Sequence, residues 1–173
     1  GNHDMWALDW AVRGDKPEIW TSQGGDRTIA SYDGGPMPKA HIDFLKSGQL
    51  WIEINNRIFI HGGFNPDILL SSHSAEALVW DRTLLDMAWK MQSMGRGCKL
   101  GRYEDIFVGH TTTELYNSLK PIKACNVWDI DTGAGWSGKL TIMNVDTKDY
   151  WQSDLTPDLY GGTPGQLAVI RNT

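Results

Sequence analysis

The chain has 173 residues, of which 40% are hydrophobic, and a formal net charge of −5. This length and apolar content predict a single domain over residues 1–173, and the acidic balance excludes nucleic-acid binding driven by overall charge. Because the sequence has no run of about 18 apolar residues and no charged-then-apolar leader, we expect no membrane span and no signal peptide.

The first part of the chain predicts short helices joined by loops. Residues 1–4, Gly-Asn-His-Asp, predict a tight loop, and apolar spacing from Asp4 to Arg13 predicts a helix that Gly14 ends. Residues 21–38 hold four glycines and two prolines and predict an ordered loop or lid. A further short helix is expected from Ala40 to Ser47.

The second part of the chain predicts strands around a helical segment. Asn55-Asn56 joins two apolar runs into a predicted β-hairpin, Leu50–Ile54 and Arg57–Ile60. Helical spacing from Ser74 to Met94 predicts one broken helix or two consecutive helices. Further strands are expected before His110 and at three later runs, Ala124–Ile130, Lys139–Val145 and Tyr150–Ser153.

The two cysteines, Cys98 and Cys125, are too few for a disulfide framework and lack the spacing of metal ligands. We therefore expect free thiols and a reducing, cytoplasmic environment.

Three candidate metal ligands follow from the motifs. Asn2 carries an amide oxygen, while His61 and His110 each follow an apolar strand and adjoin a glycine, which predicts imidazoles on loops at the strand exits. Three ligands leave open positions for water, as in catalytic metal sites. Hard divalent ions usually also take a carboxylate, which this set lacks.

The ordered motifs resemble those of the calcineurin-like metallophosphoesterases, and most closely the bacterial and phage branch of the serine/threonine phosphoprotein phosphatases. The resemblance runs from residue 1 to about 145 and rests on five motifs, which are Gly1-Asn2-His3-Asp4, Ile60-His61-Gly62-Gly63, Leu78-Val79-Trp80-Asp81-Arg82, Val108-Gly109-His110-Thr111, and Asp131-Thr132-Gly133-Ala134 continuing to Gly138-Lys139-Leu140-Thr141. It implies an α/β fold, a four-layer α/β/β/α sandwich of mixed sheets.

The resemblance also implies roles for single residues. Asn2, His61 and His110 would bind the second metal of a two-metal site, His3 would be the general acid, and Arg82 would bind the phosphoryl oxygens. The chemistry agrees, because a guanidinium binds phosphate through two parallel hydrogen bonds and an imidazole donates protons near neutral pH. Two divalent ions are expected in the complete domain, manganese first, with iron, zinc or nickel as alternatives.

The function implied by this resemblance is metal-dependent hydrolysis of phosphoric monoesters by metal-activated water. The expected substrates are phosphorylated serine or threonine in a protein, or a small phosphoester. A dinucleoside polyphosphate hydrolase of the same fold is the alternative within this mechanism.

Two motifs of the family would precede Gly1 and are not in the sequence. They would supply the first metal's ligands, a partner for His3 and a second phosphate-binding arginine. We therefore expect either an upstream segment or a homo-oligomer that covers exposed sheet edges. The remaining alternative is a catalytically silent remnant that serves as a binding module.

Overall fold

The computed structural model describes residues 1–95 and 98–159. Within them the chain forms two compact units, residues 1–49 and the residues from 50 onward. The expectation of a single domain stays a prediction. No helix of the described residues is both long and apolar enough to cross a membrane.

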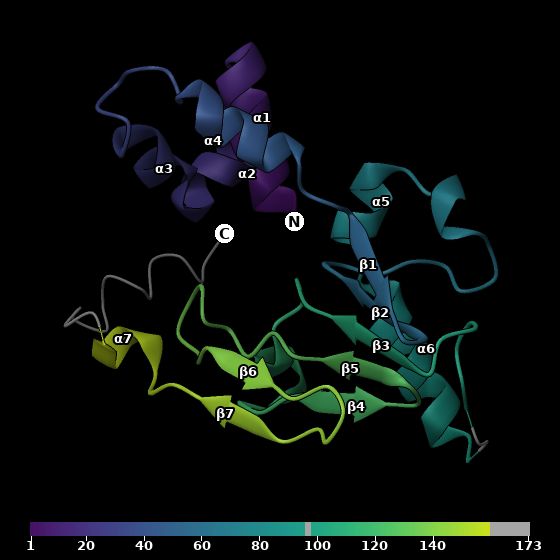
Figure 1. Cartoon of the computed structure of the whole chain (residues 1–173). Helices are drawn as coiled ribbons and strands as arrows, with labels where there is room; N and C mark the ends of the chain where they lie inside the picture. Colours follow the sequence, from purple (N-terminus) through teal and green to yellow (C-terminus); the bar gives the residue numbers. More distant parts are fainter. Residues whose placement is uncertain (96–97, 160–173) are drawn as a thin grey trace. The chain divides into compact units, whose positions relative to one another are not determined.

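The first unit is helical (Figure 1). Its elements are α1 (Asn2–Arg13), α2 (Glu18–Trp20), the π-helical turn η1 (Thr21–Gly25), α3 (Asp26–Ala30) and α4 (Lys39–Lys46). Its small core consists of Ala7, Trp10, Trp20 and Met37. Gly14 ends α1 in the left-handed conformation, as predicted.

A loop was predicted over residues 21–38, and this prediction is wrong for residues 21–30. Residues 18–30 are helical, with one kink at Gln23 and Gly24. Trp20 is 1% exposed, and a Cβ added to Gly25 would lie 2.4 Å from its ring. The glycine therefore allows the buried indole to pack against the backbone, and this packing outweighs glycine's low helix propensity.

The second unit is built on a five-stranded mixed sheet in the order β1-β2-β3-β5-β4. Its strands are β1 (Trp51–Ile54), β2 (Arg57–Ile60), β3 (Asp105–Val108), β4 (Ile122–Ala124) and β5 (Val127–Asp129). The pairs β2–β3 and β3–β5 are parallel, whereas β1–β2 and β4–β5 are antiparallel. The predicted hairpin is confirmed, because Asn55 and Asn56 form its turn with positive φ values.

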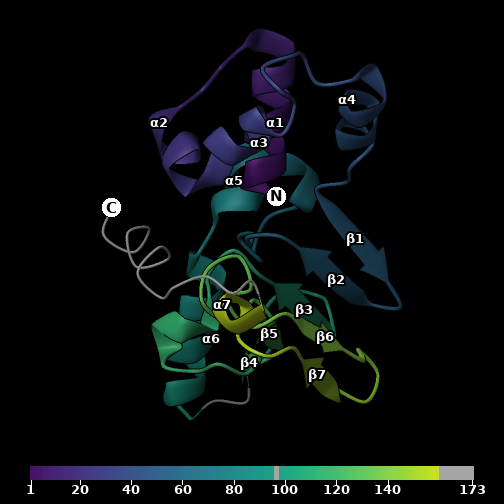
Figure 2. The same cartoon turned by 90° about the vertical axis from the view of Figure 1, so that its left-hand side faces the viewer.

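This unit also contains further helices and a second, two-stranded sheet. They are η2 (Leu70–Ser72), α5 (Ala75–Trp80), α6 (Thr83–Ser93), η3 (Thr113–Tyr116), α7 (Thr156–Leu159) and the antiparallel pair β6 (Thr141–Met143) and β7 (Tyr150–Gln152). Helix α6 lies on one face and the β6–β7 pair on the other (Figure 2). Helix, sheet and second sheet thus form successive layers of the predicted α/β sandwich.

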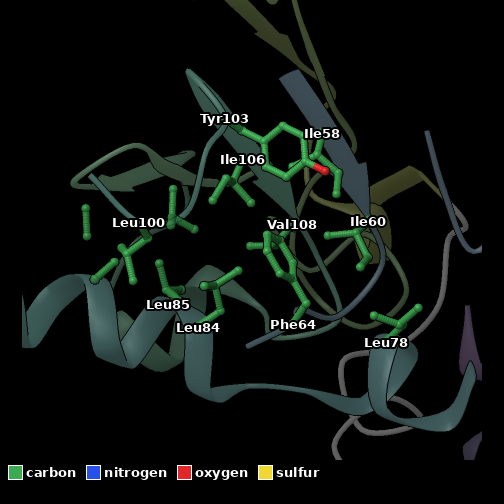
Figure 3. Packing of buried hydrophobic residues seen from close by; sticks show 13 residues of the cluster. Ile58, Ile60, Phe64, Leu78, Leu84, Leu85, Leu100, Tyr103, Ile106 and Val108 are labelled. Atoms are coloured by element: carbon green, nitrogen blue, oxygen red, sulfur yellow. The ribbon is translucent and has the colours of Figure 1, made fainter. Parts of the chain in front are cut away.

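Strand alternation assigns the two faces. Ile58, Ile106 and Val108 pack with Leu84 and Leu85 of α6 in the main core (Figure 3). The alternate residues Phe107 and Trp128 face the opposite way, where the ammonium of Lys148 lies 5.1 Å and 5.7 Å from their ring centroids. Both faces of the central strands are therefore covered, which explains why all four residues of β3 are buried.

The prediction of free thiols is wrong, because Cys98 and Cys125 form a disulfide. Cys125 lies in the β4–β5 turn, which divides the run predicted as one strand. The next residue, Asn126, is buried and fixes the segment after Cys98: it accepts a 2.8 Å hydrogen bond from the Leu100 N–H and donates to the carbonyls of Leu100 and Tyr103, both at 3.0 Å. This tertiary docking brings the sulfurs together, and spacing alone does not reveal it. A cytoplasmic location was expected because the thiols were predicted to be free, so the disulfide removes that reason.

We expect the double replacement Cys98→Ser and Cys125→Ser to lower the free energy of unfolding by about 2–4 kcal/mol, since the disulfide spans 27 positions and restricts the unfolded chain. Urea unfolding with and without dithiothreitol measures the loss. Reductant should destabilise the native sequence by a similar amount and leave the serine variant unchanged. Equal stability of all four samples would contradict the disulfide.

Candidate active site

The candidate site lies at the carboxyl ends of the parallel strands. His61 follows β2 directly, His110 is the second residue after β3, and Asp131 is the second residue after β5. Since β2, β3 and β5 run in parallel, these three positions share one edge of the sheet. In open α/β sheets ligands bind outside this edge.

The two predicted imidazoles come together there. The ring centroids of His61 and His110 lie 5.0 Å apart with an interplanar angle of 55°. The Gly109 N–H donates a 2.9 Å hydrogen bond to the His61 carbonyl, which ties the two loops. His110 itself has a φ of 66°, a left-handed conformation that is uncommon for a residue with a side chain. Such strain concentrates at functional positions.

The glycines after His61 admit a third loop to the site. A Cβ added to Gly62 would lie 2.9 Å from the carbonyl oxygen of Leu78, and one added to Gly63 would lie 3.2 Å from Oδ1 of Asp81. Only residues without a side chain allow this approach. The predicted helical run is therefore divided into α5 and α6 by a loop, at Asp81 and Arg82, that packs against the exit of β2.

Arg82 is anchored beside His110. Its Nη1 donates to the His110 carbonyl at 3.0 Å and to Oγ1 of Thr111 at 2.9 Å. The Trp80 ring meets the His110 ring edge to face, with centroids 5.1 Å apart. Arg82, predicted as the phosphate-binding residue, thus lies at the same sheet edge as both predicted histidines.

Asp131 and Thr111 flank this site, although the sequence reasoning assigned neither of them a role. A Cβ added to Gly109 would lie 3.6 Å from the Cβ of Asp131, while Oδ1 of Asp131 accepts a 3.0 Å hydrogen bond from the Gly133 N–H. The signal for Asp131 in the sequence was its place directly after the run predicted as a strand, Ala124–Ile130, in an Asp-Thr-Gly turn. The residue lies at this edge because β5 is parallel to β3.

Asp129, at the end of β5, is fully buried. It pairs in register with Val108, and its Oδ1 accepts a 3.0 Å hydrogen bond from the Asp131 N–H. Among the described residues its Oδ2 has no hydrogen-bond partner. Burial raises the pKa of Asp129 to about 8, and the Asp131 charge adds to the rise, although the hydrogen bond from the Asp131 backbone opposes it. With this pKa most of the carboxyl would be protonated at pH 7.

The predicted residues Asn2 and His3 belong to the first unit. They form the first turn of α1 rather than the expected loop. Asn2 is 4% exposed, whereas His3 is exposed, with its Nε2 3.2 Å from Oε1 of Gln23 and its ring edge-on to Trp6. Gly1 occupies the N-cap position of this helix.

The donor chemistry of the histidine pair fits a borderline divalent cation. Imidazole nitrogens suit manganese, iron, zinc and nickel. Within residues 1–95 and 98–159 no group of three or more His, Cys, Asp or Glu side chains is close enough to hold a metal ion. The described part of the chain therefore brings the His61 and His110 side chains together but forms no larger group of this kind.

Comparison with known proteins identifies the fold. No protein-family profile and no curated protein sequence matches the chain. The structure is similar to a crystal structure of a "putative diadenosine tetraphosphatase", with a TM-score of 0.56, 14% identity, and coverage of 88% of this chain and 65% of that one. It is also similar to a crystal structure of a metallophosphoesterase from Sphaerobacter thermophilus, with a TM-score of 0.50, 11% identity, and coverage of 99% of this chain and 74% of that one. The chain thus spans about two thirds of the first neighbour, and its fold is that of the metallophosphoesterases.

Proposed function

We propose that this chain carries active-site residues of a metal-dependent phosphoric ester hydrolase. The observation that carries the proposal is the convergence of His61, His110 and Arg82 at the carboxyl edge of the parallel strands, with the imidazole centroids 5.0 Å apart and the guanidinium bonded to the His110 carbonyl. Two imidazoles beside a fixed guanidinium suit a divalent cation and a phosphoryl group.

Each residue has a role in the proposed reaction. His61 and His110 would hold a divalent cation, and the resemblance of the motifs implies that Asn2 would be a third ligand. When bound, the cation lowers the pKa of a coordinated water and polarises the phosphoryl oxygen. Arg82 orients the phosphoryl group and stabilises its negative charge, and His3 donates a proton to the leaving oxygen.

The first proposed substrate class is a phosphorylated serine or threonine in a protein. A dinucleoside polyphosphate is the second, and the structural neighbour at a TM-score of 0.56 is described as a "putative diadenosine tetraphosphatase". Both substrates present a phosphoryl group to the same histidines and arginine. Their leaving groups differ, so product analysis distinguishes them.

The purified protein tests the proposal by hydrolysis of p-nitrophenyl phosphate, with manganese added and with EDTA, alongside its metal content. We expect hydrolysis that EDTA abolishes. Separate incubations with a phosphopeptide and with diadenosine tetraphosphate then identify the substrate class. If the protein retains no metal and hydrolyses none of the three substrates, the proposal fails and the binding-module alternative takes its place.

A further inference from the structure

The structure assigns Thr111 the role of a positioning residue, which fixes Arg82 so that one edge of the guanidinium faces a phosphoryl group. The inference rests on the proposed function. It identifies the residue that holds Arg82 in place and the N–H groups of Arg82 that remain available to bind substrate. All the residues involved belong to the second unit.

Both protons of one guanidinium nitrogen are already used within the protein. Nη1 of Arg82 donates to the His110 carbonyl at 3.0 Å and to the Thr111 hydroxyl at 2.9 Å. A guanidinium has five N–H groups, two on each Nη and one on Nε. The other edge, Nε with Nη2, makes no hydrogen bond or ion pair within the described part of the chain, and it has the spacing that binds two phosphoryl oxygens in parallel.

Both Thr111 and the backbone that carries Arg82 are held in place by further hydrogen bonds. Thr111 is 6% exposed, and its N–H donates a 2.7 Å hydrogen bond to the Gly109 carbonyl, so its hydroxyl has little freedom to move. The backbone of Arg82 is fixed by Asp81, whose Oδ1 accepts hydrogen bonds from the N–H groups of Thr83 at 2.6 Å and Leu84 at 3.2 Å. A flexible arginine side chain loses rotamer entropy on binding. Fixing it beforehand reduces that loss.

Thr111 accepts a hydrogen bond from Arg82, and the next residue, Thr112, offers a comparison. Thr112 is half-buried at the start of η3, and its side chain makes no capping hydrogen bond there. It therefore provides a matched control, the same residue type one position along the same loop.

The test compares Thr111→Val with Thr111→Ser and Thr112→Val. Valine keeps the shape and removes the hydroxyl, so KM for p-nitrophenyl phosphate and the dissociation constant of inorganic phosphate, measured by calorimetry, should both rise about three- to ten-fold while kcat changes less. Serine should restore both constants, and Thr112→Val should match the native protein. In an Arg82→Ala background the valine change should have no further effect on phosphate binding.

The outcomes separate the two proposals. If the protein hydrolyses nothing but Thr111→Val still weakens phosphate binding, the proposed function fails and the role of Thr111 stands. If Thr111→Val lowers only the melting temperature or the amount of active protein, with KM and phosphate affinity unchanged, Thr111 is merely structural and the inference is overturned. Absence of phosphate binding in the native protein overturns it as well.

Discussion

Replacing His61 with glutamine should lower metal-dependent hydrolysis at least about 100-fold and weaken manganese binding at least about ten-fold. Loss of groups that merely orient ligands costs about 10–100-fold, so loss of a ligand should cost no less. His61 is the better target of the pair because His110 has a φ of 66° and its replacement would also change the local backbone preference. Calorimetric titration with manganese measures binding independently of turnover.

His73 supplies the matched control in the same unit. Its Nε2 accepts a 3.0 Å hydrogen bond from the Asn65 N–H, and its Nδ1 lies 3.1 Å from the Leu69 carbonyl oxygen. His73→Gln should therefore loosen that loop and lower the melting temperature, yet leave manganese affinity as it is. Should His61→Gln bind manganese like the native protein, His61 is not a ligand and the proposed site is wrong.

The sequence allowed the histidine pair to be predicted because the relevant signals are local. Each histidine follows an apolar strand and adjoins a glycine, and β2, β3 and β5 are parallel, so their exits meet at one edge. The hairpin turn at Asn55-Asn56 was predictable for a similar reason, since both residues tolerate positive φ.

Other parts of the site depend on contacts between distant segments. The hydrogen bond from Arg82 to Thr111 joins residues 29 positions apart, and it exists because Gly62 and Gly63 let the Asp81 loop approach. No periodicity in the sequence encodes that approach. The same holds for the disulfide, which forms because Asn126 docks the segment containing Leu100.

The helical residues 18–30 show how packing can outweigh local preference. Four glycines between positions 21 and 38 favour a loop, yet Gly25 gives the Trp20 ring the space to be buried against it. The indole takes part in a small core with Trp10 and Met37. Burial of one large aromatic side chain contributes about 2–3 kcal/mol, which exceeds the helix propensity cost of one or two glycines.

Replacing Asp129 with asparagine should change how stability depends on pH. In the folded protein burial raises the pKa of Asp129 to about 8, whereas its ordinary value is 3.8. Between these values the folded state holds a proton that the unfolded state has released, so the free energy of unfolding falls as pH rises. The slope from this group is about 1.4 kcal/mol per pH unit, or roughly 4 kcal/mol between pH 5 and pH 8. The contribution is complete below pH 4 and is lost as pH rises through about 8.

Asparagine removes the titration while its carbonyl can still accept the hydrogen bond from the Asp131 N–H. Its buried amide protons should cost about 1–3 kcal/mol at every pH. The variant should therefore be less stable than the native protein at pH 4 and more stable at pH 9, as measured by urea unfolding at unit steps of pH. Thr113→Val is the control, because it removes a fully buried hydroxyl that does not titrate and should give a difference independent of pH.

A constant difference for Asp129→Asn would show that the carboxyl keeps the same charge in both states across this range. A crossing of the two curves would instead show that it is held as a neutral acid at the pH where the site is proposed to work. The turn that places Asp131 beside Gly109 would then be anchored by an uncharged oxygen. In that case Asp129 would add no second negative charge beside Asp131.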